Sequence, residues 1–305
     1  MAAGRKRAVS DGVTRVAVFG AAFGEGEWHS ADGLTLRYRD YPGRADRPPI
    51  LCIPGLTRNA RDFEPVAGRL AGEWRVICAD LRGRGQSDYA KDATSYNPLQ
   101  YADDIAALLD QAGLPRVAVF GTSLGGIVAM LLAARDPARI AGVLLNDVGP
   151  EIEPAGLARI REYVGQGRSF PTWMHAARGL RELTAAAHPD FAIDDWRDLA
   201  KRLMCVGSNG RIVFDYDMKI AEPFHQPPPD GAPADMWPAF RALAEKPLLV
   251  VRGEVSDILS AETLARMLRE APGARAATIA RTGHAPTLDE PEARAAIAQL
   301  LERIA

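Results

Sequence analysis

The sequence is poor in cysteine, nearly neutral in charge and free of long apolar runs. Its 305 residues include three cysteines, Cys52, Cys78 and Cys205, which form neither a C-x-x-C pair nor the spacing of a zinc site. A small, odd number of cysteines argues against a disulfide framework and favours a reducing, cytoplasmic location. The formal net charge of -2 gives no reason to expect nucleic acid or an anionic membrane surface as a partner. Every apolar run falls short of the ~20 residues that span a bilayer.

Motifs of metal and cofactor chemistry are also missing. The chain contains neither H-E-x-x-H nor G-x-x-x-x-G-K-[ST], and Gly20, Gly24 and Gly26 are out of register for a dinucleotide-binding fingerprint. We therefore expect that the protein needs no metal and no organic cofactor, and that its partner is a small molecule.

The amino-terminal stretch superficially resembles a signal peptide, because basic residues 5–7 precede an apolar run at 16–24. Asp11 and Arg15 lie between the two, and no small-x-small cleavage site follows the run. We interpret residues 1–27 as an amino-terminal extension, either a loose tail or an additional edge strand.

What the sequence does contain is a nucleophile elbow at Ser123. A buried-strand pattern at 116–121 runs into Gly121-Thr122-Ser123-Leu124-Gly125, and a helical pattern follows it. A tight strand-to-helix turn lifts a serine hydroxyl clear of the backbone, and its glycines let the chain double back without a side-chain collision. The amino terminus of the following helix favours the negative charge that develops on a substrate oxygen. We therefore expect Ser123 to be the nucleophile.

An activated serine needs a base, and we assign His284. It lies in Arg281-Thr282-Gly283-His284-Ala285-Pro286, between an apolar run at 276–280 and a helical run at 292–304. Gly283 and Pro286 keep this segment from continuing as strand or helix, so the imidazole is presented from a loop at the sheet edge.

The third group should be a carboxylate that orients the imidazole and stabilises the imidazolium. We choose Asp257, which follows the apolar run 247–252 at the carboxyl end of a predicted strand, where open α/β sheets place their sites. Two rivals remain open. Glu254 lies on the same loop, and Asp147 ends the preceding apolar run, 140–145.

An oxyanion hole should complete the site, because the charge of a tetrahedral intermediate needs donors already in place. The elbow predicts the backbone N–H of Leu124 as one donor. For the second we assign the N–H of Leu56, in the glycine loop that follows the predicted strand 49–53.

Strand-like runs alternate with helical stretches along most of the chain, which predicts an α/β fold with a mostly parallel sheet covered by helices on both faces. The strands are expected at 34–39, 49–53, 74–79, 116–121, 139–145, 247–252 and 275–280, and the helices at 60–71, 98–112, 124–135, 260–271 and 290–304. Residues 150–245 do not show this alternation. Their pattern predicts short helices separated by glycine and proline. We interpret this segment as a helical cap inserted into a core made of 28–149 and 246–305.

These motifs together resemble the α/β-hydrolase superfamily, in its capped, serine-esterase-like branch. The resemblance includes Asp80-Leu81-Arg82-Gly83-Arg84-Gly85-Gln86-Ser87 and the histidine loop, and it covers roughly two-thirds of the chain. The order Ser, Asp, His along the chain is the one typical of these enzymes. Pro54 stands where the family usually has the histidine of His-Gly, so this sequence departs from the pattern next to the second oxyanion donor.

The resemblance implies a serine hydrolase that cleaves a carboxylic ester or lactone through an acyl-enzyme. The predicted substrate is a modest-sized, apolar, uncharged ester bound under the cap. Two alternatives stay open. A C–C bond hydrolase of vinylogous diketones uses a similar triad, and a non-catalytic small-molecule-binding protein could be built on the same fold.

Overall fold

The computed structural model describes residues 22–225 and 234–305. Most of the expected extension 1–27, including residues 5–7, lies outside the described residues. Its last part belongs to the sheet, because the first strand begins at Gly24. The main sheet has eight strands: β1 (Gly24–His29), β2 (Thr35–Tyr41), β3 (Ile50–Ile53), β4 (Val76–Asp80), β5 (Val117–Thr122), β6 (Ile140–Asn146), β10 (Leu248–Gly253) and β11 (Arg275–Ile279).

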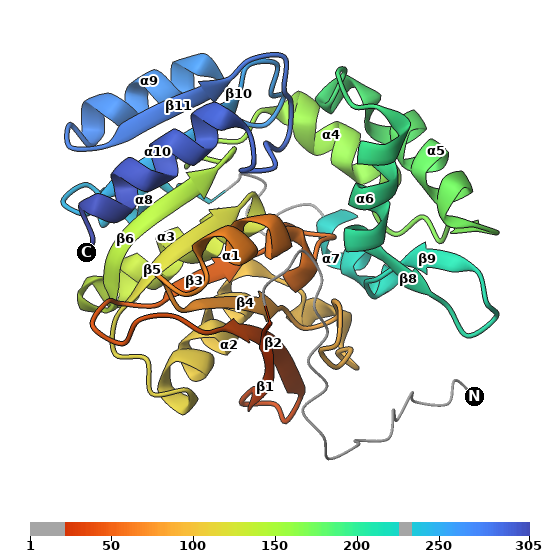
Figure 1. The fold of residues 1–305 in the computed structure, drawn as a ribbon, viewed down its shortest axis with the longest axis horizontal. Coiled ribbons are helices and arrows are strands. Elements are labelled where there is room, and N and C mark those ends of the chain that lie inside the picture. Colours follow the sequence, from red (N-terminus) through yellow and green to blue (C-terminus); the bar gives the residue numbers. More distant parts are fainter. Residues whose placement is uncertain (1–21, 226–233) are drawn as a thin grey trace.

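The strand order is β1-β2-β4-β3-β5-β6-β10-β11 (Figure 1). The first two strands join the sheet antiparallel, and the pairs from β4 to β11 are parallel. The central strands are apolar and buried on both faces, as parallel strands under helices must be. Because these strands run in one direction, their carboxyl ends meet at one edge, and the loops that follow them lie together there.

Helices cover both faces of the sheet, which confirms the predicted fold class. On one face the buried core includes residues of α2 (Pro98–Gln111), α3 (Leu124–Arg135), α8 (Trp237–Arg241) and α9 (Ala261–Glu270). On the other face it includes residues of α1 (Glu64–Leu70) and α10 (Pro291–Glu302). Side chains alternate between the two cores along β3, where Leu51 and Ile53 face the first and Ile50 and Cys52 the second.

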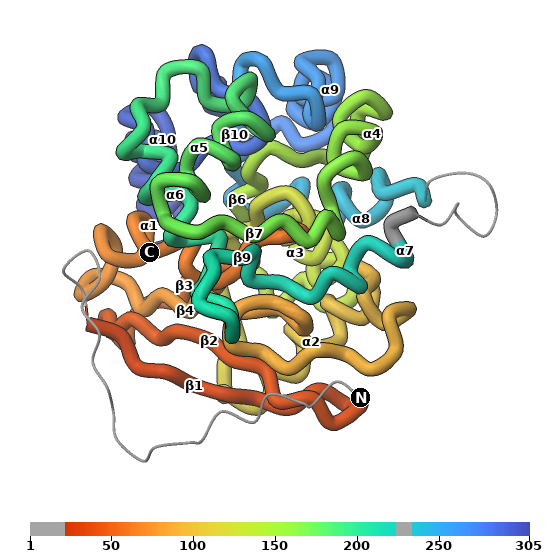
Figure 2. The backbone as a smooth tube through the Cα atoms, turned by 90° about the vertical axis from the view of Figure 1, so that its right-hand side faces the viewer, coloured from red at the N-terminus to blue at the C-terminus, as the bar shows by residue number. Residues whose placement is uncertain are grey.

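The segment after β6, which we call the cap, lies over one end of the sheet (Figure 1). Figure 2 shows it in front of the central strands after a turn of 90°. Its helices are α4 (Pro154–Tyr163), α5 (Trp173–Thr184), α6 (Ile193–Leu203) and α7 (Ala221–His225). It also contains a three-stranded sheet that the sequence did not predict, in the order β7 (Ser169–Phe170), β9 (Ile212–Phe214), β8 (Met204–Val206). Strands of two or three residues are too short to show a period of two in the sequence.

The cap has a small hydrophobic core of its own, in which Trp196 is buried against α5 and α6 residues. In the part of the chain that the structure describes, no helix combines the length and the apolar composition needed to cross a membrane.

Candidate active site

Ser123 lies at the turn between β5 and α3 in a strained backbone conformation. Its φ is 52° and its ψ is -117°, a region that residues with a side chain rarely adopt. Neighbouring glycines make the turn possible by close packing. A Cβ at Gly125 would lie 1.9 Å from the carbonyl oxygen of Ile53, and a Cβ at Gly121 would lie 2.5 Å from the backbone of Gly125. The sequence therefore folds here as the predicted elbow requires.

The structure brings His284 to Ser123 across 161 positions of the chain, from the loop that follows β11. Its Nε2 is 3.0 Å from the Ser123 Oγ, and its Nδ1 is 2.8 Å from the Oδ2 of Asp147. The imidazole side chain is 10% exposed and the Asp147 side chain is fully buried. A hydroxyl, an imidazole and a buried carboxylate thus form one continuous row of hydrogen bonds, which is the arrangement that proton transfer from a serine needs.

The carboxylate beside His284 is Asp147, so the choice of Asp257 from the sequence requires a correction. Asp257 forms two hydrogen bonds with Arg159 of α4, Nε to Oδ2 at 2.5 Å and Nη2 to Oδ1 at 2.8 Å. Burial raises the pKa of Asp257, but the hydrogen bonds and charge of Arg159, together with a smaller electrostatic effect of His284, outweigh it and leave that pKa below its ordinary value. Asp257 is therefore a charged partner of the cap.

The reason for this difference is the register between neighbouring strands. Asp147 immediately follows β6, which pairs in parallel with β10. The end of β10 binds its carboxylate, because Gly253 N donates to Oδ1 at 2.8 Å and Ser256 Oγ donates to Oδ2 at 2.6 Å. The loop on which Asp257 lies therefore supports Asp147 instead of supplying the carboxylate itself. The other rival, Glu254, accepts a hydrogen bond from the backbone N–H of Arg281.

The two predicted oxyanion donors belong to residues close to Ser123. Leu124 is the first residue of α3, so its N–H has no acceptor within the helix. Leu56 follows Gly55, whose Cβ position is 3.5 Å from the Ser123 Cβ. In the described ranges, neither N–H donates a hydrogen bond to another group of the protein. Both groups are therefore free to bind a substrate oxygen.

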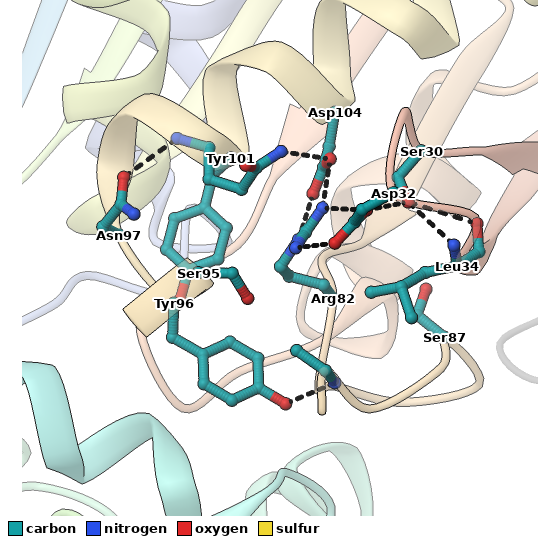
Figure 3. A network of polar contacts seen from close by, with 12 residues as sticks. Ser30, Asp32, Leu34, Arg82, Ser87, Ser95, Tyr96, Asn97, Tyr101 and Asp104 are labelled. Carbon is teal, nitrogen blue, oxygen red and sulfur yellow. Dashed lines mark hydrogen bonds and ion pairs between the residues drawn. The ribbon is translucent and has the colours of Figure 1, made fainter. Parts of the chain in front are cut away.

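A buried arginine, Arg84, holds the loop that carries Leu56. Its Nε donates to the Leu56 carbonyl oxygen at 2.9 Å, and its Nη1 donates to the Arg82 carbonyl at 2.6 Å and to the Tyr101 hydroxyl at 2.9 Å. Figure 3 shows how the neighbouring Arg82 is itself fixed, by the carboxylates of Asp104 and Asp32. The loop after β4 thus forms a rigid support for the loop after β3.

A cavity opens above Ser123 between the core and the cap, and its two sides have different compositions. We call the residues from the core the core wall: Gly55, Leu56, Thr57, Arg58, Ser123 and His284. We call those from the cap the cap wall: Arg159, Ile160, Tyr163, Leu180, Leu183, Thr184, His188, Leu199, Leu203 and Phe214. The cap wall is largely apolar, as expected, but two arginines in the lining were not anticipated.

His188 of the cap wall is uncharged at neutral pH. Burial lowers its pKa to about 3, and electrostatic interactions with Arg58, Arg202 and His284 act in the same direction. Neither this histidine nor the two arginines carried a motif in the sequence. These three residues line the site because the cap packs against the core, and the contacting segments are far apart in the sequence.

A larger hollow of about 640 Å³ lies elsewhere, between α1, α6 and the loop before α10. Its lining is rich in charged side chains, and it includes none of Ser123, His284 and Asp147. The arrangement of groups around Ser123, and not the size of a hollow, therefore identifies the candidate active site.

Comparison with known proteins agrees with the fold. A profile described as "Alpha/beta hydrolase family" matches residues 50–297. The chain therefore belongs to the alpha/beta hydrolase family, and it is a hydrolase.

Three similar proteins illustrate this membership. A 3-hydroxybutyrate-oligomer hydrolase of Cupriavidus necator is 35% identical over 262 residues, which are 84% of this chain and 89% of that protein. An esterase of Mycobacterium tuberculosis is 29% identical over 257 residues, 81% and 80% of the two chains. The crystal structure of an alpha/beta hydrolase from Novosphingobium aromaticivorans is 60% identical, covers 92% of this chain and 98% of its own, and superimposes with a TM-score of 0.88.

Proposed function

We propose that this member of the alpha/beta hydrolase family is a serine hydrolase that cleaves carboxylic esters through an acyl-enzyme. One observation carries the proposal: the row of hydrogen bonds from the Ser123 hydroxyl through His284 to the buried Asp147 carboxylate. The named activity of the M. tuberculosis relative supports the choice of esters.

In the first half of the reaction, the Ser123 Oγ attacks the ester carbonyl carbon. His284 Nε2 takes the hydroxyl proton. Asp147 accepts a hydrogen bond from the Nδ1–H of His284 and stabilises the imidazolium. The N–H groups of Leu56 and Leu124 bind the oxygen of the tetrahedral intermediate. When the intermediate collapses, the C–O bond to the alcohol breaks and His284 returns the proton to the leaving oxygen.

In the second half, water attacks the acyl-enzyme at the same carbonyl carbon. His284 accepts a proton from the water, the oxyanion forms again between the same two N–H groups, and the bond to Ser123 breaks as the proton returns to its oxygen. The products are a carboxylic acid and regenerated enzyme. The cap wall limits access of bulk water to the site during both halves.

The test substrates follow from this chemistry and from the relatives. They are 4-nitrophenyl butyrate, a linear dimer of 3-hydroxybutyrate, in which an ester joins the two units, and a lactone. A vinylogous diketone is included because the C–C hydrolase alternative predicts cleavage of that compound instead. Preference for the diketone over all three esters would replace the proposal with that alternative.

The sharpest experiment is covalent labelling by a fluorophosphonate, followed by mass-spectrometric mapping of the adduct. We expect one adduct, on Ser123, and loss of both labelling and ester turnover in Ser123→Ala. The loss of kcat should be roughly 1,000-fold or more, because a missing nucleophile removes the acyl-enzyme route. Folding of the variant is checked by circular dichroism. Ester turnover within a few-fold of the wild-type rate in a folded Ser123→Ala protein would overturn the proposal.

A further inference from the structure

An arginine of the core wall, Arg58, has no role in the chemistry described so far, yet its side chain passes close to the nucleophile. Its backbone N–H donates to the Gly55 carbonyl at 3.2 Å and closes the turn that carries Leu56. Its Cδ lies 3.7 Å from the Cβ position of Gly55, which is itself 3.5 Å from the Ser123 Cβ. The side chain therefore runs along the cavity beside Ser123.

The cavity is lined by two positive side chains and by no carboxylate among the described residues. Arg58 contributes one charge from the core wall and Arg159 the other from the cap wall. Their partners, Asp62 and Asp257, are absent from the lining. The two guanidinium side chains therefore line the cavity, whereas the carboxylates that pair with them do not. Arg58 also acts at a distance, because its charge contributes to the lowered pKa of His188.

The two arginines differ in the hydrogen-bonding capacity that they leave free. Arg159 uses two nitrogens of its fork on the two oxygens of Asp257. Arg58 uses Nη1 alone, at 3.1 Å and 3.0 Å from the two oxygens of Asp62. Within residues 22–225 and 234–305 its Nε and Nη2 donate no hydrogen bond, although the side chain is only 18% exposed. Charged donors in such a site favour an anionic acceptor strongly.

We propose that Arg58 binds a carboxylate of the substrate, so that the enzyme acts on esters which carry a free carboxylate near the scissile bond. This inference rests on the proposed function and refines its substrate class. It replaces the uncharged ester expected from the sequence. A guanidinium is suited to this task because its planar fork matches the two oxygens of a carboxylate. Arg159 adds a second positive charge from the cap side.

Two pairs of substrates test the inference, each differing by one charge. In the first pair, 4-nitrophenyl hydrogen glutarate and 4-nitrophenyl pentanoate have acyl chains of equal length, and the carboxylate replaces a methyl group. In the second pair, the 3-hydroxybutyrate dimer is compared with its terminal carboxamide, so the carboxylate lies on the alcohol side. The readout is the ratio of kcat/KM, anionic over neutral, after subtraction of the uncatalysed rate. A general loss of activity cancels in this ratio.

The variants are Arg58→Gln, which removes the charge, and Arg58→Lys, which keeps the charge without the fork. Arg135→Gln is the matched control, because it makes the same change of net charge at an exposed ion pair at the end of α3. In the wild-type protein we expect a ratio above 1 in at least one pair. Arg58→Gln should lower that ratio about 10- to 100-fold, the effect of a hydrogen bond to a charged group. Arg58→Lys should restore part of it, and Arg135→Gln should leave it unchanged.

An Arg58→Gln ratio equal to the wild-type ratio in both pairs would overturn the inference, and so would a wild-type preference for the neutral member of each pair. Neither result touches the proposed function, since the neutral esters would still be cleaved. Failure of the proposed function looks different: no ester of either charge is cleaved and Ser123 takes no fluorophosphonate label.

Discussion

The two walls of the cavity are held in place by different kinds of interaction. The core wall depends on the backbone. Ser123 has a strained conformation in a turn where a Cβ built at Gly121 or Gly125 would lie within 2.5 Å of other backbone atoms. His284 bonds to the Asp147 carboxylate, which accepts a hydrogen bond from the N–H of Gly253. The cap wall depends on side chains. The cap has its own small hydrophobic cluster, and ion pairs such as Arg159 with Asp257 and Arg61 with Asp215 join it to the core.

The difference between backbone-held and side-chain-held groups suggests that they serve different roles, the first in reactivity and the second in the selection of substrates. Groups positioned by the main chain cannot move far without unfolding the turn, which suits a proton relay that tolerates little misplacement. Groups positioned by side chains can be exchanged without disturbing the sheet, which suits a surface that selects the substrate. Changes to the core-wall groups that the main chain positions should therefore cost activity on every ester. Changes to side chains that reach into the cavity, which include Arg58 and the cap wall, should act on stability or on the choice of ester.

The largest effect expected from a glycine change is at the elbow. An alanine Cβ at Gly125 would lie 1.9 Å from the Ile53 carbonyl oxygen and 2.6 Å from its carbon, both of them backbone atoms. Gly125→Ala should lower kcat about 100-fold through misplacement of Ser123. It should also lower the free energy of unfolding by about 1–3 kcal/mol. Ester kinetics and urea titration measure the two effects.

The matched control for this change is Gly273→Ala, because no atom lies within 4 Å of a Cβ built at Gly273. Its kinetics and unfolding curve should resemble those of the wild-type protein. If the two alanine variants had the same kcat and the same free energy of unfolding, the core wall would tolerate movement of its backbone. The proposed difference between the two walls would then be wrong.

A smaller effect is expected when the support of the core wall is weakened. Arg84→Met removes the donor to the Leu56 carbonyl, so the loop that presents the Leu56 N–H loses its anchor. We expect kcat to fall about 10-fold, as for one hydrogen bond to a charged group, with KM little changed. Arg84→Lys should recover part of the loss. An increase in KM alone, with kcat unchanged, would place Arg84 in substrate binding instead.

On the cap wall, His188 should affect the pH dependence of stability. The folded protein keeps this imidazole neutral down to a pKa of about 3, whereas the unfolded chain binds a proton below about pH 6.5. The unfolded state therefore holds more protons, and the free energy of unfolding falls as the pH drops from 6.5 towards 3. This histidine contributes a slope of up to about 1.4 kcal/mol per pH unit.

His188→Phe removes that contribution, so the difference in unfolding free energy between wild type and variant should shift in favour of the variant as the pH falls. Urea titrations at four pH values between 7.5 and 4.5 measure this difference, and other titrating groups cancel in it. Parallel profiles for the two proteins would mean that His188 is not shielded from water as the structure indicates.

Most of the core could be predicted from the sequence, because its signals are local. The apolar run 116–121 and the helical pattern after it correspond to β5 and α3, and the asparagine-proline start of the helix at 98 is observed in α2. β1 was predicted only as one of two alternatives, because residues 1–27 were interpreted as either a loose tail or an additional edge strand. Its sequence GEGEWH contains two glycines, and Trp28 is its one buried residue. Its stability comes from pairing with β2.

The carboxylate that bonds to His284 could not be identified from local sequence patterns. Asp147 and Asp257 both follow buried strands, and both lie between Ser123 and His284 in the chain. The pairing of Val251 with Asn146 and the hydrogen bonds at the end of β10 decide between them, and these contacts span more than 100 positions. The cap arginine that binds Asp257 lies 98 positions from it. No pattern within either loop carries this information.

The most direct test of the account is therefore a comparison of Asp147→Asn with Asp257→Asn on 4-nitrophenyl butyrate. We predict that Asp147→Asn lowers kcat/KM roughly 1,000- to 10,000-fold, because the imidazole loses the carboxylate that fixes its tautomer. Asp257→Asn should lower it about 5-fold at most, because its ion pair with Arg159 is about one-third exposed. The reverse order, with the greater loss in Asp257→Asn, would contradict the proton relay through Asp147.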